Sequence, residues 1–268
     1  EHLGWRSAML CLAALCAVAG VAAAACLDRD PARRGWLPDG VRLAPPTDRS
    51  DGTRAAAAAP APATPTLAAS AATGMTLRQA VHASVFHWLY LSTLAASPLM
   101  FMPFAHLSAS ARDHGLDESQ TLWLISLIGI GSLVGRFVIG ALADRLGRTI
   151  TITLAQGVLA VSMLLWWGSE TLLGFGVFAI VFGLSYGGIV SLMPPICSDL
   201  FGTRAVAGII GVLYSGAAFG ALIGPLMAGG LFDRFGSYAP AQMVGLALGL
   251  SATAASARMA RMSRRAAS

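Results

Sequence analysis

Residues 121–148 read TLWLISLIGIGSLVGRFVIGALADRLGR. No acidic side chain occurs before Asp144, and this apolar length is enough to cross a hydrocarbon core of about 30 Å at ~1.5 Å per residue. One cation, Arg136, interrupts the run. A charge at that depth costs ~2.5 kcal/mol or more, so it normally faces a water-filled cavity or a partner. The charged turn that follows makes the stretch more typical of a transporter helix than of a plain membrane anchor.

The composition of the whole chain points to the same class. Hydrophobic residues make up 56% of the chain and charged residues only 12%, whereas a soluble domain carries about twice that charge. The apolar runs are continuous, whereas the strands of an outer-membrane barrel alternate between apolar and polar positions. The sequence therefore predicts an all-α membrane protein.

Seven apolar runs predict seven transmembrane helices. The first fills residues 1–27, and a signal peptide is the less favoured alternative because the run is longer than a usual signal core. The other six belong to a bundle over residues 78–258, roughly at 80–107, 119–143, 149–167, 171–194, 205–232 and 239–257. The chain begins at Glu1 rather than at a methionine, so we expect a fragment of a longer protein.

Two polar segments complete the predicted organisation. Residues 28–77 carry scattered arginines and then an Ala- and Pro-rich stretch with little bulky apolar surface, so we expect a disordered linker. Residues 259–268 form a basic tail. If linker and tail are cytoplasmic, fourteen arginines lie inside and three outside, a strong positive-inside asymmetry. We expect a multi-pass protein of a bacterial inner membrane.

Gly216, Gly220 and Gly224 recur four residues apart on one face of the predicted sixth helix. Glycines at this spacing let two helix backbones approach closely in a membrane, where lipid supplies no hydrophobic drive between helices. We therefore assign these three glycines to helix packing.

The turn that ends the opening stretch follows a recognisable pattern. Its residues are Gly140, Asp144, Arg145, Gly147 and Arg148. The pattern resembles the signature loop of the major facilitator superfamily between helices 8 and 9. The resemblance implies a conformational latch, which joins helices at the inner face and loosens during alternation. The alternative is a turn whose arginines only set the orientation.

Three further stretches resemble the monocarboxylate transporter group of that superfamily and its oxalate/formate-antiporter relatives. They are residues 101–107, 131–136 and 202–238. The resemblance implies that the chain corresponds to helix 6 followed by the C-terminal six-helix bundle. Its partners would then be the missing helices 1–5 of the same protein and the lipid bilayer.

Arg136 is the first candidate for substrate binding, because a small carboxylate in a low-dielectric cavity needs a fixed cation with a planar fork of donors. It lies ~7 Å from the helix midpoint, and its alternative role is to snorkel to the headgroups. Ser132 stands one turn away and could donate to the substrate. Tyr186 holds the place of an aromatic beside the substrate in the resembling family, and His106 could hold a proton near neutral pH. Packing or interfacial roles are the alternatives for these three.

These residues predict a secondary active transporter for a small organic anion, with a monocarboxylate favoured, working by alternating access. A coupled proton is a further candidate partner, although Ser132 stands where animal monocarboxylate carriers have an aspartate. The alternatives are a transport-inactive membrane fragment or scaffold, and a carrier of a neutral solute or drug. The sequence has no nucleophile–base pair, phosphate loop or metal-ligand cluster. We therefore expect no enzyme activity, cofactor, metal or nucleic-acid partner.

Overall fold

The computed structural model describes residues 5–26 and 74–267. These residues fall into two units, Glu1–Pro62 and Ala63–Ser268. Throughout the described residues the chain is helical apart from short turns and one isolated bridge between Gly74 and Gly202. The predicted all-α class is therefore confirmed.

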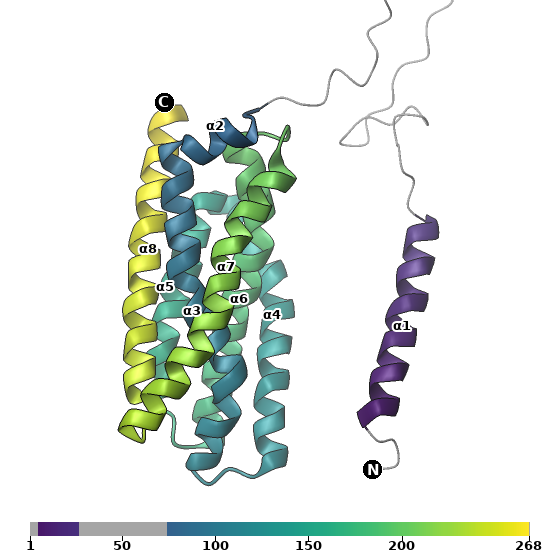
Figure 1. The fold of residues 1–268 in the computed structure, drawn as a ribbon, viewed down its shortest axis with the longest axis vertical. Helices are drawn as coiled ribbons and strands as arrows, with labels where there is room; N and C mark the ends of the chain where they lie inside the picture. The colour runs from purple at the N-terminus through teal and green to yellow at the C-terminus, as the bar shows by residue number, and fades with distance from the viewer. Residues whose placement is uncertain (1–4, 27–73, 268) are drawn as a thin grey trace, which may run out of the picture. The chain divides into compact units, whose positions relative to one another are not determined.

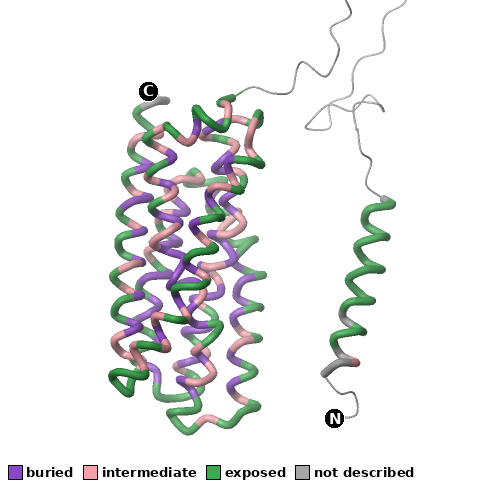
Figure 2. Tube along the Cα trace, viewed as in Figure 1, coloured by how far each residue is buried: buried purple, intermediate pink, exposed green. Residues whose placement is uncertain are grey.

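The described part of the first unit is a single helix, α1 (Trp5–Cys26). Its apolar part, Met9–Ala25, lies at the lower limit of the length that a membrane span needs. Apart from Ser7, the described side chains of α1 are exposed (Figure 2). The predicted linker over residues 28–77 lies outside the described residues up to residue 73.

The described part of the second unit consists of one short helix followed by six long ones (Figure 1). They are α2 (Leu77–His82), α3 (Ser84–Asp113), α4 (Glu118–Leu146), α5 (Arg148–Trp167), α6 (Leu172–Phe201), α7 (Val206–Phe235) and α8 (Ala239–Ala267). Each of the six helices α3 to α8 is long and apolar enough to cross a membrane. An all-helical membrane fold is thus built from the runs that the sequence marks as apolar.

Two boundaries differ from the predicted ones for local reasons. The run predicted from residue 80 is divided, because a capping box between Thr76 and Gln79 starts α2 earlier and the extended backbone of Ala83 separates α2 from α3. At the other end, α8 continues through residues 259–267, which the sequence suggested as a tail. Alanine, methionine and arginine dominate this segment, and all three favour helix.

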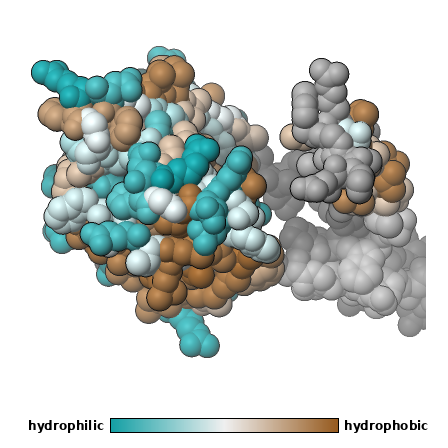
Figure 3. Space-filling view, turned by 90° about the horizontal axis from the view of Figure 1, so that it is seen from below, coloured by the Kyte–Doolittle hydropathy of each residue, from teal (hydrophilic) through white to brown (hydrophobic). Residues whose placement is uncertain are grey.

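Helices α3 to α8 alternate in direction, so their connections gather at two ends of the bundle (Figure 1). One end, called here the α2 end, holds α2, the α4–α5 and α6–α7 turns and the last turns of α8. Its described arginines are Arg78, Arg145, Arg148, Arg204, Arg258, Arg261, Arg264 and Arg265. The opposite end carries Arg112 and Arg234. Seen from that opposite end, hydrophilic side chains gather over the helix ends and hydrophobic ones cover the flank (Figure 3).

Glycines on both partners bring α4 and α6 into backbone contact. Gly131 and Gly135 of α4 lie against the α6 backbone, and Gly183 and Gly187 of α6 lie against the α4 backbone. A Cβ atom at any of the four positions would collide with a backbone carbonyl of the partner helix. The α4–α6 contact therefore depends on the missing side chains on both sides.

The glycines of α7 lie against α3 in a similar way. Gly220 and Gly224 face the backbone at residues 97–98 of α3, where an added Cβ would collide. Gly216 faces the ring of Tyr90, with 3.3 Å between an ideal Cβ and the ring carbons. The three positions assigned to helix packing thus lie in the α3–α7 contact.

Candidate functional site

A cavity of 230 Å³ lies between the middle parts of α3, α6 and α7, with one residue contributed by α5. Apolar and small side chains form most of its wall, and the polar groups come from Thr93, Ser97, Gln156, Tyr186 and Tyr214. None of the described residues that line it carries a charge at neutral pH. The space suits a small solute rather than a drug-sized one, since pockets for the latter are about 300–1,000 Å³.

Tyr186 is the one predicted substrate-binding residue that lines this cavity. Its ring is fixed on two sides, by Phe104 of α3 at 5.3 Å and by Phe182 of α6 at 6.2 Å between ring centroids. Its hydroxyl makes no hydrogen bond to another residue in the part of the chain that the structure describes, and neither does that of Tyr214 on α7. Two hydroxyl groups are therefore available to a solute in the cavity.

Gln156 is a cavity residue that sequence reasoning missed. It is buried in α5 and exchanges hydrogen bonds with Ser92 of α3, at 3.0 Å to its Oε1 and 2.8 Å from its Nε2. The pair satisfies the amide and fixes its orientation. The signal that could have found it is the amide within an otherwise apolar run, because polar groups inside membrane helices often mark function.

Arg136 and Ser132 lie outside the lining of the cavity. Ser132 is buried in the α4–α6 contact, where its backbone carbonyl faces Gly187, whereas Arg136 is exposed on α4. Arg136 makes no hydrogen bond or ion pair with any residue that the structure describes. The two residues are only one turn apart, but α6 covers Ser132 and leaves the face of Arg136 open.

His106 lies nearer the opposite end and joins three helices instead of lining the cavity. Its Nε2 lies 2.9 Å from the carbonyl oxygen of Pro225 in α7, and its Nδ1 lies 3.4 Å from the hydroxyl of Tyr238, just before α8. Burial raises the pKa of Tyr238, and the nearby carboxylate of Asp113 raises it further, so this hydroxyl stays protonated. Nε2 can donate to the carbonyl oxygen and Nδ1 lies within reach of the tyrosine hydroxyl, so His106 braces α3 against α7 and Tyr238.

A series of aromatic rings connects this brace to the cavity. Trp166 of α5 lies between Tyr238 and Phe178, and Phe182 and Tyr186 follow along α6, with successive ring centroids 5.2–6.4 Å apart. Trp166 also donates from Nε1 to the hydroxyl of Ser110 at 3.2 Å. This packed series holds Tyr186 in one place in the cavity wall.

The turn predicted as a latch makes an ion pair that the sequence did not indicate. Arg148, at the start of α5, donates from Nη1 to both carboxylate oxygens of Asp199 in α6, at 2.6 and 2.7 Å. Asp144 and Arg145 are exposed and form no ion pair with the described residues. Among the described residues, the ion pair of this turn is therefore made by Arg148 with another helix. Gly147, with φ +88°, makes the tight connection possible.

Gly140 lies close to the same turn, one helical turn before Asp144, and an added Cβ there would meet nothing within 4 Å. Packing in the described unit therefore does not require glycine at this position.

In the described unit, six long apolar helices, four of them in glycine-mediated pairs, and a mostly apolar cavity with a few polar groups at mid-depth are typical of a multi-pass membrane protein of the transporter type. Residues 89–266 match the family model described as Major Facilitator Superfamily, so the chain belongs to that superfamily.

Individual relatives include both exporters and monocarboxylate carriers by name. The chain is 26% identical over 164 residues to the aspyridones efflux protein apdF of Emericella nidulans, covering 59% of this chain and 34% of the relative. It is 29% identical over 141 residues to monocarboxylate transporter 12-B of Danio rerio, covering 51% and 30%. It is 34% identical over 146 residues to the MFS-type transporter hasB of Aspergillus fumigatus, covering 52% and 32%. The chain thus spans about a third of the length of these eukaryotic relatives.

Proposed function

We propose that the chain is the C-terminal part of a secondary transporter that moves a small organic anion, such as a monocarboxylate, by alternating access. The observation that carries this proposal is Arg136, a cation on an apolar helix with no partner among the described residues. Helices 1–5 of the same protein would form the other wall of the substrate site.

The depth of Arg136 along α4 favours a role in binding an anionic partner. It lies four residues beyond the midpoint of α4, which is ~6 Å along the axis. If that midpoint lies at the bilayer centre, the residue is ~9 Å short of the edge of the hydrocarbon core. A guanidinium at this depth is costly in lipid and stable beside a carboxylate, which its planar fork can bind with two hydrogen bonds.

The exposed flank around Arg136 is consistent with coverage by further helices. Only 28% of the apolar part of α4 is buried in the described unit, and for α7 the share is 22%, compared with 56% for α3 and α6. Leu133 and Phe137, which are close to Arg136 on α4, are exposed. Another helical bundle placed against α4 would enclose Arg136 in a water-filled cavity.

The cavity would hold the uncharged part of the substrate in this proposal. Tyr186 lies at the midpoint of α6, so it is at a depth comparable to that of Arg136 on α4. Its hydroxyl and that of Tyr214 can donate to a carbonyl or hydroxyl group of the solute, and the apolar wall can contact a short carbon chain.

The proposed transport cycle requires contacts that form and break at the helix ends. We assign this role to the Arg148–Asp199 pair, because both side chains are partly exposed and link the start of α5 to the end of α6. A pair of this kind contributes little to stability, so it can open at low cost when the helix ends rearrange during the cycle. The α2 end, with its many arginines, would face the cytoplasm.

A second candidate function is favoured by one specific observation. The described cavity is uncharged, which suits a neutral amphipathic solute as well as the carbon chain of an anion.

Uptake by the complete protein in proteoliposomes separates the two candidates. Short radiolabelled monocarboxylates and neutral analogues of the same size, such as the corresponding primary amides, would be compared. Uptake that depends on the carboxylate and is lost in Arg136→Ala supports the anion carrier. Equal uptake of acid and amide, unaffected by this substitution, would favour the neutral-solute carrier.

A further inference from the structure

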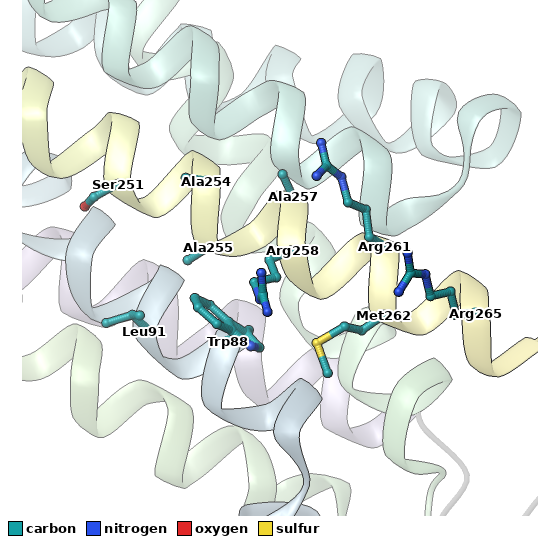
Figure 4. A pocket seen from close by; sticks show the side chains of 10 residues that line it. All are labelled: Trp88, Leu91, Ser251, Ala254, Ala255, Ala257, Arg258, Arg261, Met262 and Arg265. Atoms are coloured by element: carbon teal, nitrogen blue, oxygen red, sulfur yellow. The ribbon is translucent and has the colours of Figure 1, made fainter.

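A groove of 630 Å³ lies at the α2 end, between the start of α3 and the last turns of α8 (Figure 4). It is separate from the candidate substrate cavity and shares none of its lining residues. We call it the α3–α8 groove. Trp88 and Leu91 form its α3 side, and α8 contributes the rest.

Three arginines give the groove a positive rim. Arg258, Arg261 and Arg265 follow one another at i, i+3 and i+7, so the helical repeat places them along one side of α8. None of the described residues that line the groove is acidic. Arg264, on the same turns, does not line the groove, which shows that the rim is a selected face and not the whole basic segment.

The cation nearest α3 is held in position by an aromatic ring. The guanidinium carbon of Arg258 lies 5.0 Å from the centroid of the Trp88 ring, and the two side chains point toward each other across the groove (Figure 4). A cation–π contact of this kind orients the guanidinium. Since the ring uses the face of the guanidinium, its N–H donors remain directed outward for an anion.

The part of the groove farther from the helix end is mostly apolar. Leu91, Ala254 and Ala255 line it together with Ser251, and the small side chains of α8 leave a depression beside the arginines. A ligand that fills both parts needs an anionic group joined to an apolar chain. Both requirements are met by a phospholipid with a net negative headgroup, which is at hand because the six long helices are apolar enough to lie in a membrane.

We propose that the α3–α8 groove binds one anionic phospholipid, with its phosphodiester on Arg258 and Arg261 and an acyl chain along Leu91 and the alanines. The groove lies at the arginine-rich end of the bundle, where the headgroups of the bilayer would be. Basic residues near a membrane surface attract anionic lipids. The inference does not depend on which solute the protein carries.

Binding is tested on the full chain purified in a neutral detergent. Dioctanoyl phosphatidylglycerol is titrated into the protein. The apparent melting temperature is recorded at each concentration, and native mass spectrometry measures the bound lipid. Dioctanoyl phosphatidylcholine and inorganic phosphate are run as separate probes. We expect saturable binding and thermal protection with phosphatidylglycerol only.

The matched variants remove two charges each from the same end of the bundle. The double substitution Arg258→Gln and Arg261→Gln should weaken phosphatidylglycerol binding on the order of tenfold or more. The control double substitution Arg204→Gln and Arg264→Gln should change it less than about threefold, because neither residue lines the groove. All four arginines are exposed, so folding should persist in both variants.

Several results would overturn the proposal. An equal loss of phosphatidylglycerol affinity in both double variants would mean that general surface charge attracts the lipid. Equal thermal protection by phosphatidylcholine would mean that the groove binds any lipid chain without using the arginines. Protection by inorganic phosphate alone would indicate a free-anion site. Absence of binding by the unsubstituted chain would mean that another part of the protein covers the groove. A Trp88→Leu variant with unchanged affinity would remove the role assigned to the ring.

Discussion

Replacing Arg136 by lysine distinguishes substrate binding from snorkelling, because the two roles make opposite demands on the side chain. A bound carboxylate needs the planar fork of the guanidinium, which lysine lacks although it keeps the charge. A side chain that only reaches for the headgroups needs length and charge, and lysine supplies both. The companion substitution Arg136→Ala removes the charge altogether.

The expected magnitudes follow from the setting of Arg136 on α4. If the carboxylate and Arg136 form an enclosed pair, Arg136→Ala should cost ~2–4 kcal/mol of binding free energy, or about 30-fold to about 1,000-fold in affinity. Arg136→Lys loses one charge-assisted hydrogen bond of the fork, which is ~1.5–3 kcal/mol. The free energy of unfolding should change little in either variant, because Arg136 makes no ion pair or hydrogen bond with the described residues.

The assay is protection of the complete purified protein against heat by a short monocarboxylate, titrated for the unsubstituted protein and both variants. Arg264→Ala serves as a control, since it removes an exposed arginine at the end of α8 and outside the cavity. Near-normal affinity in the lysine variant would refute the bidentate role. Near-normal affinity in the alanine variant would refute Arg136 as the substrate cation.

Three further expectations rest on contacts in the described bundle. Gly187→Ala should lower the melting temperature, since its Cβ collides with the α4 backbone and overpacking costs ~1–3 kcal/mol, whereas Gly211→Ala, in open space, should be neutral or stabilising. Asp199→Asn should alter the transport rate while costing no more than ~1 kcal/mol of stability, and Asp144→Asn, which breaks no ion pair in the described residues, should leave the rate unchanged if Asp199 is the latch partner. Tyr186→Phe should weaken substrate protection by up to roughly tenfold without a stability loss, because only a hydroxyl is removed from a packed ring.

Much of the fold could be predicted because the membrane imposes length and polarity on each helix. Six apolar runs coincide with α3 to α8, and the glycine spacing of α7 marks its contact with α3. Boundaries were harder, because they depend on local hydrogen bonds. The capping box at Thr76 and Gln79 begins a helix that apolarity does not indicate, and the basic segment of α8 continues a helix beyond the apolar limit.

The candidate site could be predicted only residue by residue. The structure places Tyr186 in the cavity wall and His106 in a contact between helices nearer the opposite end. Gln156 and Asp199 were missed, since their importance comes from partners far along the chain, Ser92 on α3 and Arg148 on α5. A single sequence gives the chemistry of each side chain but not which distant residue it meets.

The division of charge in the bundle indicates what the rest of the protein must supply. The cavity wall is neutral, and the cation at comparable depth stands on the exposed flank of α4. A carboxylate in the cavity alone would lack a counter-charge, and Arg136 alone in lipid would lack solvation, so each is unfavourable without the other. The second bundle that we propose would resolve both problems at once by enclosing water and the cation beside the cavity. It would also cover the apolar surface that α4 and α7 leave exposed within the described unit. In this proposal the substrate site is shared between two halves, and its opening to either side of the membrane would follow from the movement of one half against the other.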